Sequence, residues 1–383
     1  MRLGDSSLKM PHPSPAYRDT EEKLMCTSHH TMTAEDLAEL AARFAGTLPS
    51  QNELTASIFE TPLPVPEGQV PPAYEPERYA LAGEESGEGT RRRSEQGQDG
   101  RRRNLAFPPA PAPLPYAIVD NHTHMDLLDG EVAVTARDAL DTGEALGIGA
   151  IVQVGCDVPS SLYAVRVAHA DARVLAAIAL HPNEAPKLEE AGQLDAALNV
   201  IEKLAQDERV RAIGETGLDY FRTGEEGVEA QQRSFREHIR IAKTYGKALQ
   251  IHDRDAHEDV VRILREEGAP ETVIFHCYSG DPDLAEICNG EGWYMSFAGT
   301  VTFKNSQGIQ ESLKLARRDL ILAETDAPFL TPHPFRGRPN ASYMTNYTVR
   351  FMAQYLDADL EELCRDIRAN SLDAYGSWGV EGF

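Results

Sequence analysis

Two histidines one residue apart, His122 and His124, follow an apolar run in the sequence YAIVDNHTHMD. In a β-strand, residues i and i+2 point to the same side, so a strand ending here would present both imidazoles together. Imidazole is a common ligand of divalent metal ions, and this pair would supply half of a metal site. A hydrogen-bonded structural pair and two exposed loop histidines are the alternatives. Further ligands elsewhere in the chain must decide between these interpretations.

Strands that could bring such ligands together follow one another from residue 116 onward, where short apolar runs alternate with segments of helical periodicity. Continuous apolar runs are typical of parallel strands that are covered on both faces. Eight runs favour an α/β fold of the (β/α)8 TIM type over an open doubly wound sheet, and no GxGxxG motif follows the first run. The runs span residues 116–121, 149–155, 174–182, 210–217, 247–252, 272–280, 293–299 and 320–328.

Polar residues stand at the C-terminal ends of several predicted strands, and this end of a barrel carries the active site. Singly, each has an ordinary explanation as a salt-bridged carboxylate, a hydrogen-bonded core histidine or a turn cap. Together they favour a metal site, because buried imidazoles and carboxylates without partners are costly. A pair of divalent ions that share one carboxylate would satisfy all of them. The set is His122, His124, Glu215, His252, His276 and Asp326.

Five motifs in this part of the chain carry a family resemblance: DNHTHMD, GETGLDY, IHDRDA, FHCYSG and ETDAPFLTPHPFRGRPN. In this order, over roughly residues 116–380, they resemble the TatD-type metal-dependent deoxyribonucleases of the amidohydrolase superfamily. The sequence departs from the family pattern at Asn340-Ala341-Ser342, where the family more often shows Asn-Glu-Pro. This departure concerns the local substrate loop and none of the proposed ligands.

The resemblance implies two divalent ions, with Mg²⁺, Mn²⁺ and Zn²⁺ all open. The first ion would be held by His122, His124 and Asp326. The second would be held by His252 and His276, with Glu215 bridging the two. Relatives that bridge their metals with a modified lysine on the fourth strand are disfavoured, because that strand offers a glutamate.

The expected activity is hydrolysis of phosphodiester bonds in nucleic acid, with DNA preferred to RNA and single strands or ends as the exonuclease-like target. Two ions would activate a shared water and clamp the phosphate oxygens, while Asp326 and Glu215 act as catalytic ligands and Asp326 also as general base. The nearest alternative is a hydrolase of a small ester, amide or lactone with the same metal pair. A binding protein built on an inactive barrel is a third, more distant possibility.

Substrate contacts are expected from side chains that follow the predicted ligands. Arg254 and Arg336 match phosphate geometry, although surface ion pairs explain them equally well. Tyr220, followed by Phe221, could stack a base at a loop tip or pack against the barrel rim. Asp120 could orient a ligand histidine or simply end the strand with a turn hydrogen bond.

Residues 1–115 differ in composition from the rest, with Pro-, Glu- and Arg-rich stretches that cannot bury enough apolar surface to order themselves. We therefore predict a mostly disordered extension over residues 1–115 and a hydrolase barrel over residues 116–383. One short amphipathic helix is expected from Thr33 to Phe44. The arginine triplets at 91–93 and 101–103 are interpreted as a solvated linker, because acidic residues lie before and between them, with a tether to nucleic acid as the alternative.

The chain of 383 residues carries a net charge of −24, which is opposite to the basic footprint of a protein that coats duplex DNA. It holds five cysteines with no CxxC pair, a pattern typical of a reduced, cytosolic protein. The sequence shows no apolar run of about 18 residues and no charged-then-apolar signal pattern. We therefore expect a cytoplasmic protein with no membrane partner, and the oligomeric state stays open.

Overall fold

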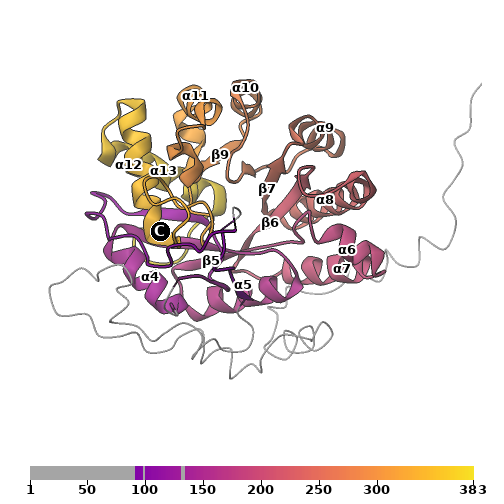
Figure 1. The fold of residues 1–383 in the computed structure, drawn as a ribbon. Helices are drawn as coiled ribbons and strands as arrows, with labels where there is room; N and C mark the ends of the chain where they lie inside the picture. Colours follow the sequence, from indigo (N-terminus) through magenta and orange to yellow (C-terminus); the bar gives the residue numbers. More distant parts are fainter. Residues whose placement is uncertain (1–90, 98–99, 131–133) are drawn as a thin grey trace, which may run out of the picture.

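The barrel predicted from the apolar runs is present in the computed structural model, which describes residues 91–97, 100–130 and 134–383 (Figure 1). Eight parallel strands form one sheet in the order β10-β9-β8-β7-β6-β5-β4-β2. A parallel bridge between Thr123 and Ala327 joins its two ends. The strands are β2 (Ile118–Thr123), β4 (Ile148–Gly155), β5 (Val174–Ile178), β6 (Val210–Asp219), β7 (Ala248–Arg254), β8 (Val273–Phe275), β9 (Tyr294–Phe297) and β10 (Ile321–Ala323).

Helices alternate with these strands and surround the sheet (Figure 1). Their ends carry the expected signals. Asp157 caps α5 by accepting the backbone N–H of Ser160, and α8 ends at Gly246, whose φ of 60° suits glycine. The helices are α4 (Ala136–Ala145), α5 (Val158–Ala170), α6 (Ala185–Glu190), α7 (Leu194–Leu204), α8 (Glu225–Tyr245), α9 (His257–Glu267), α10 (Pro282–Glu291), α11 (Gln307–Leu315), α12 (Thr345–Leu356) and α13 (Leu360–Tyr375), with short 3₁₀ turns η3 (Gly299–Thr302), η4 (Arg318–Leu320) and η5 (Ser342–Met344).

The barrel interior is filled with apolar side chains on the side away from the strand C-termini. Val119, Val152 and Leu175 are fully buried there, together with Trp378 from the residues after α13. The indole Nε1 of Trp378 donates to the carbonyl of Ile151 at 3.0 Å. Because this end is packed shut, the strand C-termini are the open face on which polar groups can meet a substrate.

Part of the predicted extension packs on the barrel. The short strand β1 (Arg91–Arg92) pairs in parallel with β3 (Leu127–Leu128), and Leu105 and Leu114 are buried. Contacts with the barrel therefore begin before the predicted boundary between residues 115 and 116. The boundary itself stays a prediction. The helix predicted from Thr33 to Phe44 lies outside the described residues.

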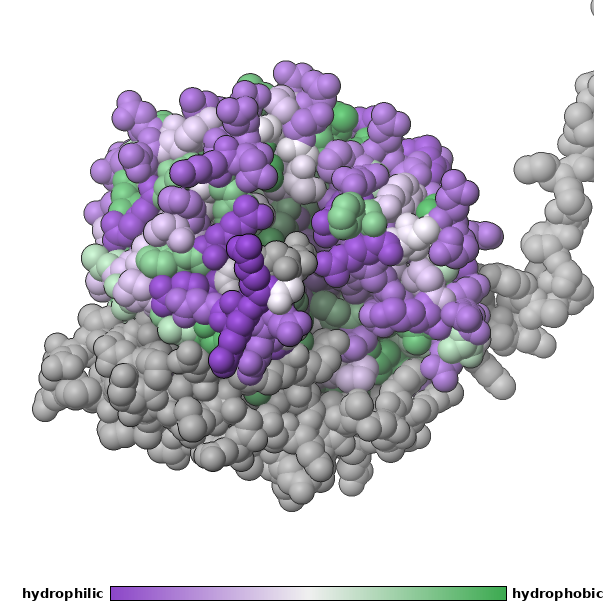
Figure 2. All heavy atoms as spheres, in the orientation of Figure 1, coloured by the Kyte–Doolittle hydropathy of each residue, from purple (hydrophilic) through white to green (hydrophobic). Residues whose placement is uncertain are grey.

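Hydrophilic side chains cover most of the face drawn in Figure 2, which is hollowed near its middle. Among the helices of the described ranges, none combines the length and the apolar character needed to cross a membrane.

Candidate metal centre

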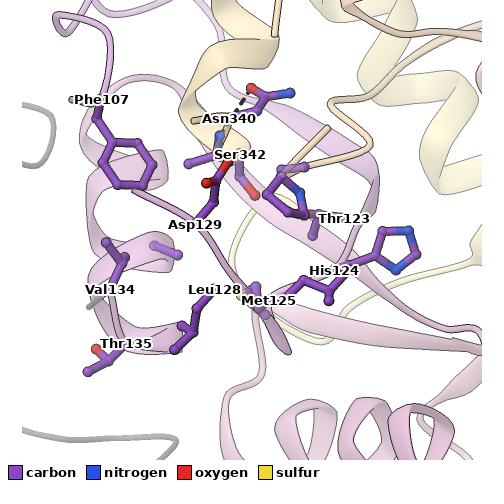
Figure 3. A pocket seen from close by; sticks show the side chains of 15 residues that line it. Phe107, Thr123, His124, Met125, Leu128, Asp129, Val134, Thr135, Asn340 and Ser342 are labelled. Atoms are coloured by element: carbon purple, nitrogen blue, oxygen red, sulfur yellow. Dashed lines mark hydrogen bonds between the residues drawn. The ribbon is translucent and has the colours of Figure 1, made fainter. Parts of the chain in front are cut away.

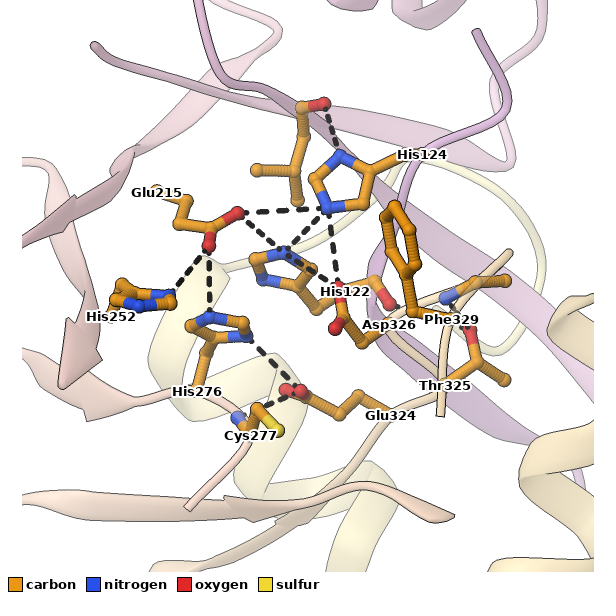
Figure 4. Close-up of polar contacts among 12 residues, drawn as sticks. His122, His124, Glu215, His252, His276, Cys277, Glu324, Thr325, Asp326 and Phe329 are labelled. Atoms are coloured by element: carbon orange, nitrogen blue, oxygen red, sulfur yellow. Dashed lines mark hydrogen bonds and ion pairs between the residues drawn. The ribbon is translucent and has the colours of Figure 1, made fainter. Parts of the chain in front are cut away.

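The first two predicted ligands lie at the end of β2 with their ring nitrogens facing each other. Nε2 of His122 is 3.2 Å from Nε2 of His124 (Figure 4). The opposite nitrogen of each ring donates a hydrogen bond: Nδ1 of His122 to Oε1 of Gln250 at 3.0 Å, and Nδ1 of His124 to the carbonyl of Val154 at 3.0 Å. In the neutral rings both Nε2 atoms are therefore unprotonated and carry lone pairs. Two buried lone pairs at this distance fit a site that holds a cation between them.

Two carboxylates complete this half of the cluster. Oε2 of Glu215 lies 3.4 Å from Nε2 of His122 and 3.6 Å from Nε2 of His124. Oδ1 of Asp326 lies 3.3 Å from Nε2 of His124 and 3.8 Å from Nε2 of His122. The turn after β10 places Asp326, whose backbone N–H donates to the carbonyl of His122 at 2.9 Å. One set of ligands thus comes from strands at the start, middle and end of the barrel.

The other oxygen of Glu215 faces a second set of imidazoles. Oε1 lies 2.9 Å from Nδ1 of His252 and 3.3 Å from Nε2 of His276. Nε2 of His276 is buried and makes no hydrogen bond to any described residue, as expected of a metal ligand. Burial alone would raise the pKa of Glu215, but the surrounding imidazoles hold that pKa well below its usual range.

Two further carboxylates orient these imidazoles from behind. Oε1 of Glu324 lies 3.2 Å from Nδ1 of His276 and accepts the backbone N–H of Cys277 at 2.7 Å. Oδ2 of Asp219 lies 3.3 Å from Nε2 of His252. Carboxylates commonly hold metal-ligating histidines in this way. The sequence reasoning missed both, although each is an acidic residue at the end of an apolar run.

His181, which the sequence reasoning also missed, follows β5 and joins the cluster. Its Nε2 lies 3.1 Å from Oε1 of Glu215, while its Nδ1 accepts the backbone N–H of Asn183 at 3.0 Å. A backbone N–H can only donate, so the neutral ring of His181 carries its proton on Nε2. His181 therefore presents an N–H to the centre, whereas the predicted ligands present lone pairs. The sequence did carry a signal for His181, because this histidine lies near the end of the apolar run 174–182.

Asp120 orients a turn and does not contact a ligand ring. Its buried carboxylate accepts the backbone N–H of Thr325 at 2.8 Å and the Thr325 hydroxyl at 2.7 Å. Burial raises the pKa of Asp120 to about 7. The ring of His122 is instead oriented by Gln250, a polar residue between Leu249 and Ile251 in β7.

A model of the family described as TatD related DNase matches residues 119–376. The chain belongs to this family. The uncharacterized metal-dependent hydrolase TatD of Mycobacterium tuberculosis is 41% identical over 263 residues, which cover 68% of this chain and 98% of that protein. The uncharacterized metal-dependent hydrolase YabD of Bacillus subtilis is 37% identical over 248 residues, covering 64% of this chain and 94% of that protein.

Solved structures support the fold of this TatD-family chain. The TatD homologue YjjV of Escherichia coli superposes with a TM-score of 0.62 at 22% identity, covering 68% of this chain and 98% of that one. A TatD-family hydrolase of Entamoeba histolytica gives a TM-score of 0.60 at 18% identity, with coverage of 69% and 100%. The curated relatives bear the name of metal-dependent hydrolases, and the histidine–carboxylate cluster of this TatD-family chain fits that class.

The two predicted phosphate contacts of the TatD-family chain lie outside the ligand cluster, each stacked on a phenylalanine. The guanidinium of Arg254, at the end of β7, lies 3.9 Å from the ring centroid of Phe221. The guanidinium of Arg336, in the loop after β10, lies 4.5 Å from the ring centroid of Phe303. Their roles in substrate binding stay predictions.

Tyr220 and Phe221 differ in how free their rings are. The hydroxyl of Tyr220 donates to Oδ2 of Asp259 at 2.7 Å and accepts from Gln232 at 2.8 Å, and its ring packs partly against the core. The neighbouring Phe221 is 63% exposed. If a base stacks on this loop, Phe221 offers the freer surface.

A small pocket of about 50 Å³ lies beside the ligand pair of β2. Figure 3 shows His124 on one side and Phe107, from the packed part of the extension, on the other. Asn340 lines it and also donates to the carbonyls of Thr325 at 3.1 Å and Phe329 at 2.5 Å. Asn340, which matches the family pattern, thus supports the turn carrying Asp326, whereas the departure falls on Ala341 and Ser342.

Proposed function

We propose that this protein is a metal-dependent phosphodiesterase, a deoxyribonuclease that acts on single strands or on strand ends. One observation carries the proposal: the two carboxylate oxygens of Glu215 face two different sets of imidazole lone pairs. In this proposal His122, His124, Asp326 and Glu215 would hold one ion. Glu215, His252 and His276 would hold a second ion.

When bound, two divalent ions supply Lewis-acid stabilisation of a phosphate and a lowered pKa for an attacking water. The mixture of imidazole and carboxylate ligands favours Zn²⁺ or Mn²⁺ over Mg²⁺, which prefers oxygen ligands.

Asp326 is the proposed general base. Its side chain is 15% exposed, compared with 6% for Glu215, so a water molecule reaches it more readily. Burial would raise the pKa of Asp326, but a hydrogen bond with His124 and the nearby His122 lower it. The carboxylate therefore stays ionised and can accept the proton of the attacking water. His181, whose Nε2–H faces Oε1 of Glu215, is the proposed hydrogen-bond donor to a phosphate oxygen bound at the centre.

The four cysteines in the described part of the chain form no disulfide. This arrangement supports the proposed cytoplasmic location, since cytosolic thiols are kept reduced.

The test is digestion of end-labelled single- and double-stranded DNA and RNA oligonucleotides by the full chain, across a panel of Zn²⁺, Mn²⁺ and Mg²⁺. Small esters, amides and lactones are assayed in parallel. We expect metal-dependent shortening of DNA from its ends, and Glu215→Gln, which keeps the side-chain shape, should reduce the rate by at least about a thousandfold. Turnover of a small ester or lactone without cleavage of nucleic acid would replace this proposal with its alternative.

A further inference from the structure

The packed part of the extension brings arginines to the edge of the candidate centre. Strand β1 pairs with β3, which begins three residues after His124. The family model begins at residue 119, and the matched 263 residues already account for 98% of the mycobacterial relative. The arginine-bearing segment of residues 91–103 therefore lies outside the residues that the family model matches.

Arg103 fixes this segment to the barrel. Its Nη1 and Nη2 donate to the two carboxylate oxygens of Asp129 at 2.9 and 2.5 Å, and its Nε donates to the carbonyl of Gly337 at 2.9 Å. Nη1 also donates to the carbonyl of Ser94 at 2.9 Å. The side chain is 5% exposed. A bidentate, buried pair of this kind holds a segment in one geometry.

Arg93 shares the same carboxylate but is less fully engaged. Its Nη1 lies 3.3 Å from Oδ2 of Asp129 and donates to the carbonyl of Pro328 at 2.5 Å. Toward the described residues it donates only through Nη1, and its side chain is 25% exposed. One carboxylate thus faces two guanidinium groups, so the ion pairs among the described side chains bring two positive charges and one negative charge to this position.

The position of Arg93 connects that charge to the candidate centre. Its guanidinium lies 4.9 Å from the ring centroid of Phe329, whose backbone N–H donates to the carbonyl of Asp326 at 2.8 Å. Figure 4 shows the ring of Phe329 beside Asp326 and His124. Burial and the neighbouring Arg103 lower the pKa of Arg93, while Asp129 and Asp326 oppose that shift.

We propose that Arg93 binds a phosphate group of the nucleic-acid substrate at the mouth of the site, with Arg103 and Asp129 holding the segment in place. This inference rests on the proposed function. A guanidinium matches phosphate geometry, and a chain with a net charge of −24 needs local cations to hold a polyanion near its carboxylates. The extension would then supply a substrate contact that the barrel alone lacks.

The test compares Arg93→Ala with Arg102→Ala, a matched control in the same segment whose side chain is 80% exposed and 3.7 Å from Glu95. Binding of a fluorescein-labelled single-stranded DNA oligonucleotide is measured by anisotropy in full-length Glu215→Gln protein, so that hydrolysis does not interfere. We expect Arg93→Ala to raise Kd about tenfold and to reduce the slope of log Kd against log salt by about 0.7. Arg93→Lys should recover part of the affinity, and Arg102→Ala should bind as the parent does.

Activity measurements separate binding from folding. With Glu215 intact, Arg93→Ala should raise KM for the oligonucleotide with little change in kcat, whereas Arg102→Ala should match the wild type in both. Thermal melting of Arg93→Ala and Arg103→Ala reports any loss of the packed segment. If the wild type cleaves DNA but Arg93→Ala and Arg102→Ala show equal oligonucleotide affinity and equal salt slope, this inference is overturned. The proposed function then still stands. Absence of nucleic-acid cleavage by the wild type would overturn the proposed function and this inference with it.

Discussion

Nε2 of His181 lies 3.1 Å from Oε1 of Glu215 and carries the ring proton, because Nδ1 accepts a backbone N–H. This relationship separates His181 from the predicted ligands His252 and His276, whose lone pairs would bind a metal ion beside the same carboxylate. A residue can therefore belong to the cluster as a hydrogen-bond donor without being a metal ligand.

Replacing His181 with alanine should leave the metal content unchanged and reduce kcat about a hundredfold, the usual cost of one lost donor to a developing negative charge. Elemental analysis of dialysed protein gives the metal content, and steady-state kinetics gives the rate. His276→Ala is the matched comparison, and it should lose metal. Loss of one metal equivalent from His181→Ala as well would make this residue a ligand.

Chelation should destabilise the fold as well as abolish activity. A metal ion that binds His122 and His124 in the native state, and not in the unfolded chain, stabilises the native state. At about 100 times its Kd, a metal ion adds about 2.7 kcal/mol to the free energy of unfolding. Urea denaturation with and without a chelator measures the difference. An unchanged midpoint in a protein that binds metal at this cluster would contradict the expectation.

His238 on α8 should make stability depend on pH. Its Nε2 accepts the backbone N–H of Leu180 at 3.3 Å, and its Nδ1 contacts the hydroxyl of Thr216 at 2.8 Å. Burial lowers the pKa of His238 to about 3, so the folded ring stays neutral while the unfolded ring gains a proton below about pH 6.5. Stability is therefore full above pH 6.5 and is lost as the pH falls toward 3.

The expected loss from His238 between pH 7.5 and 5.5 is about 1.4 kcal/mol by proton linkage. Urea denaturation at both pH values measures it. His238→Gln removes the titrating group, so the difference between the two pH values should shrink by about this amount. Identical pH dependence in the two proteins would show that His238 does not titrate in this way.

Phe221→Ala should weaken binding of single-stranded DNA by about 1 to 3 kcal/mol, because an exposed ring at the rim can stack a base. Tyr220→Phe removes only the hydroxyl held by Asp259 and should bind DNA as the wild type does. Anisotropy titrations in Glu215→Gln protein compare the two. A larger loss for Tyr220→Ala than for Phe221→Ala would return the stacking role to Tyr220.

Several elements could be predicted because their signals are local. His252 lies at the end of an apolar run and Asp326 lies three residues after Ala323, the end of β10, and the shared end of parallel strands then brings them together. The same rule applied to the run 174–182 points to His181, although none of the five family motifs includes this run. Gln250 also carried a signal, as a polar side chain within a buried strand.

Other features have no local pattern. The pairing of Arg93 and Arg103 with Asp129 joins residues that are 36 and 26 positions apart, on the two sides of a change in composition. Composition describes how much apolar surface a segment can bury, but it does not reveal which distant carboxylate will receive its arginines. For this reason residues 91–115 were predicted as part of an unpacked extension.

One chain of hydrogen bonds crosses the barrel from its last helix to its first strand. Nε2 of Gln250 donates to the hydroxyl of Tyr375 at 2.6 Å. Oε1 of the same amide accepts a hydrogen bond from Nδ1 of His122. The orientation of the first ligand therefore depends on a residue synthesised some 250 positions later. While the ribosome still holds α13, His122 lacks this support, so the centre is completed only after α13 has left the ribosome.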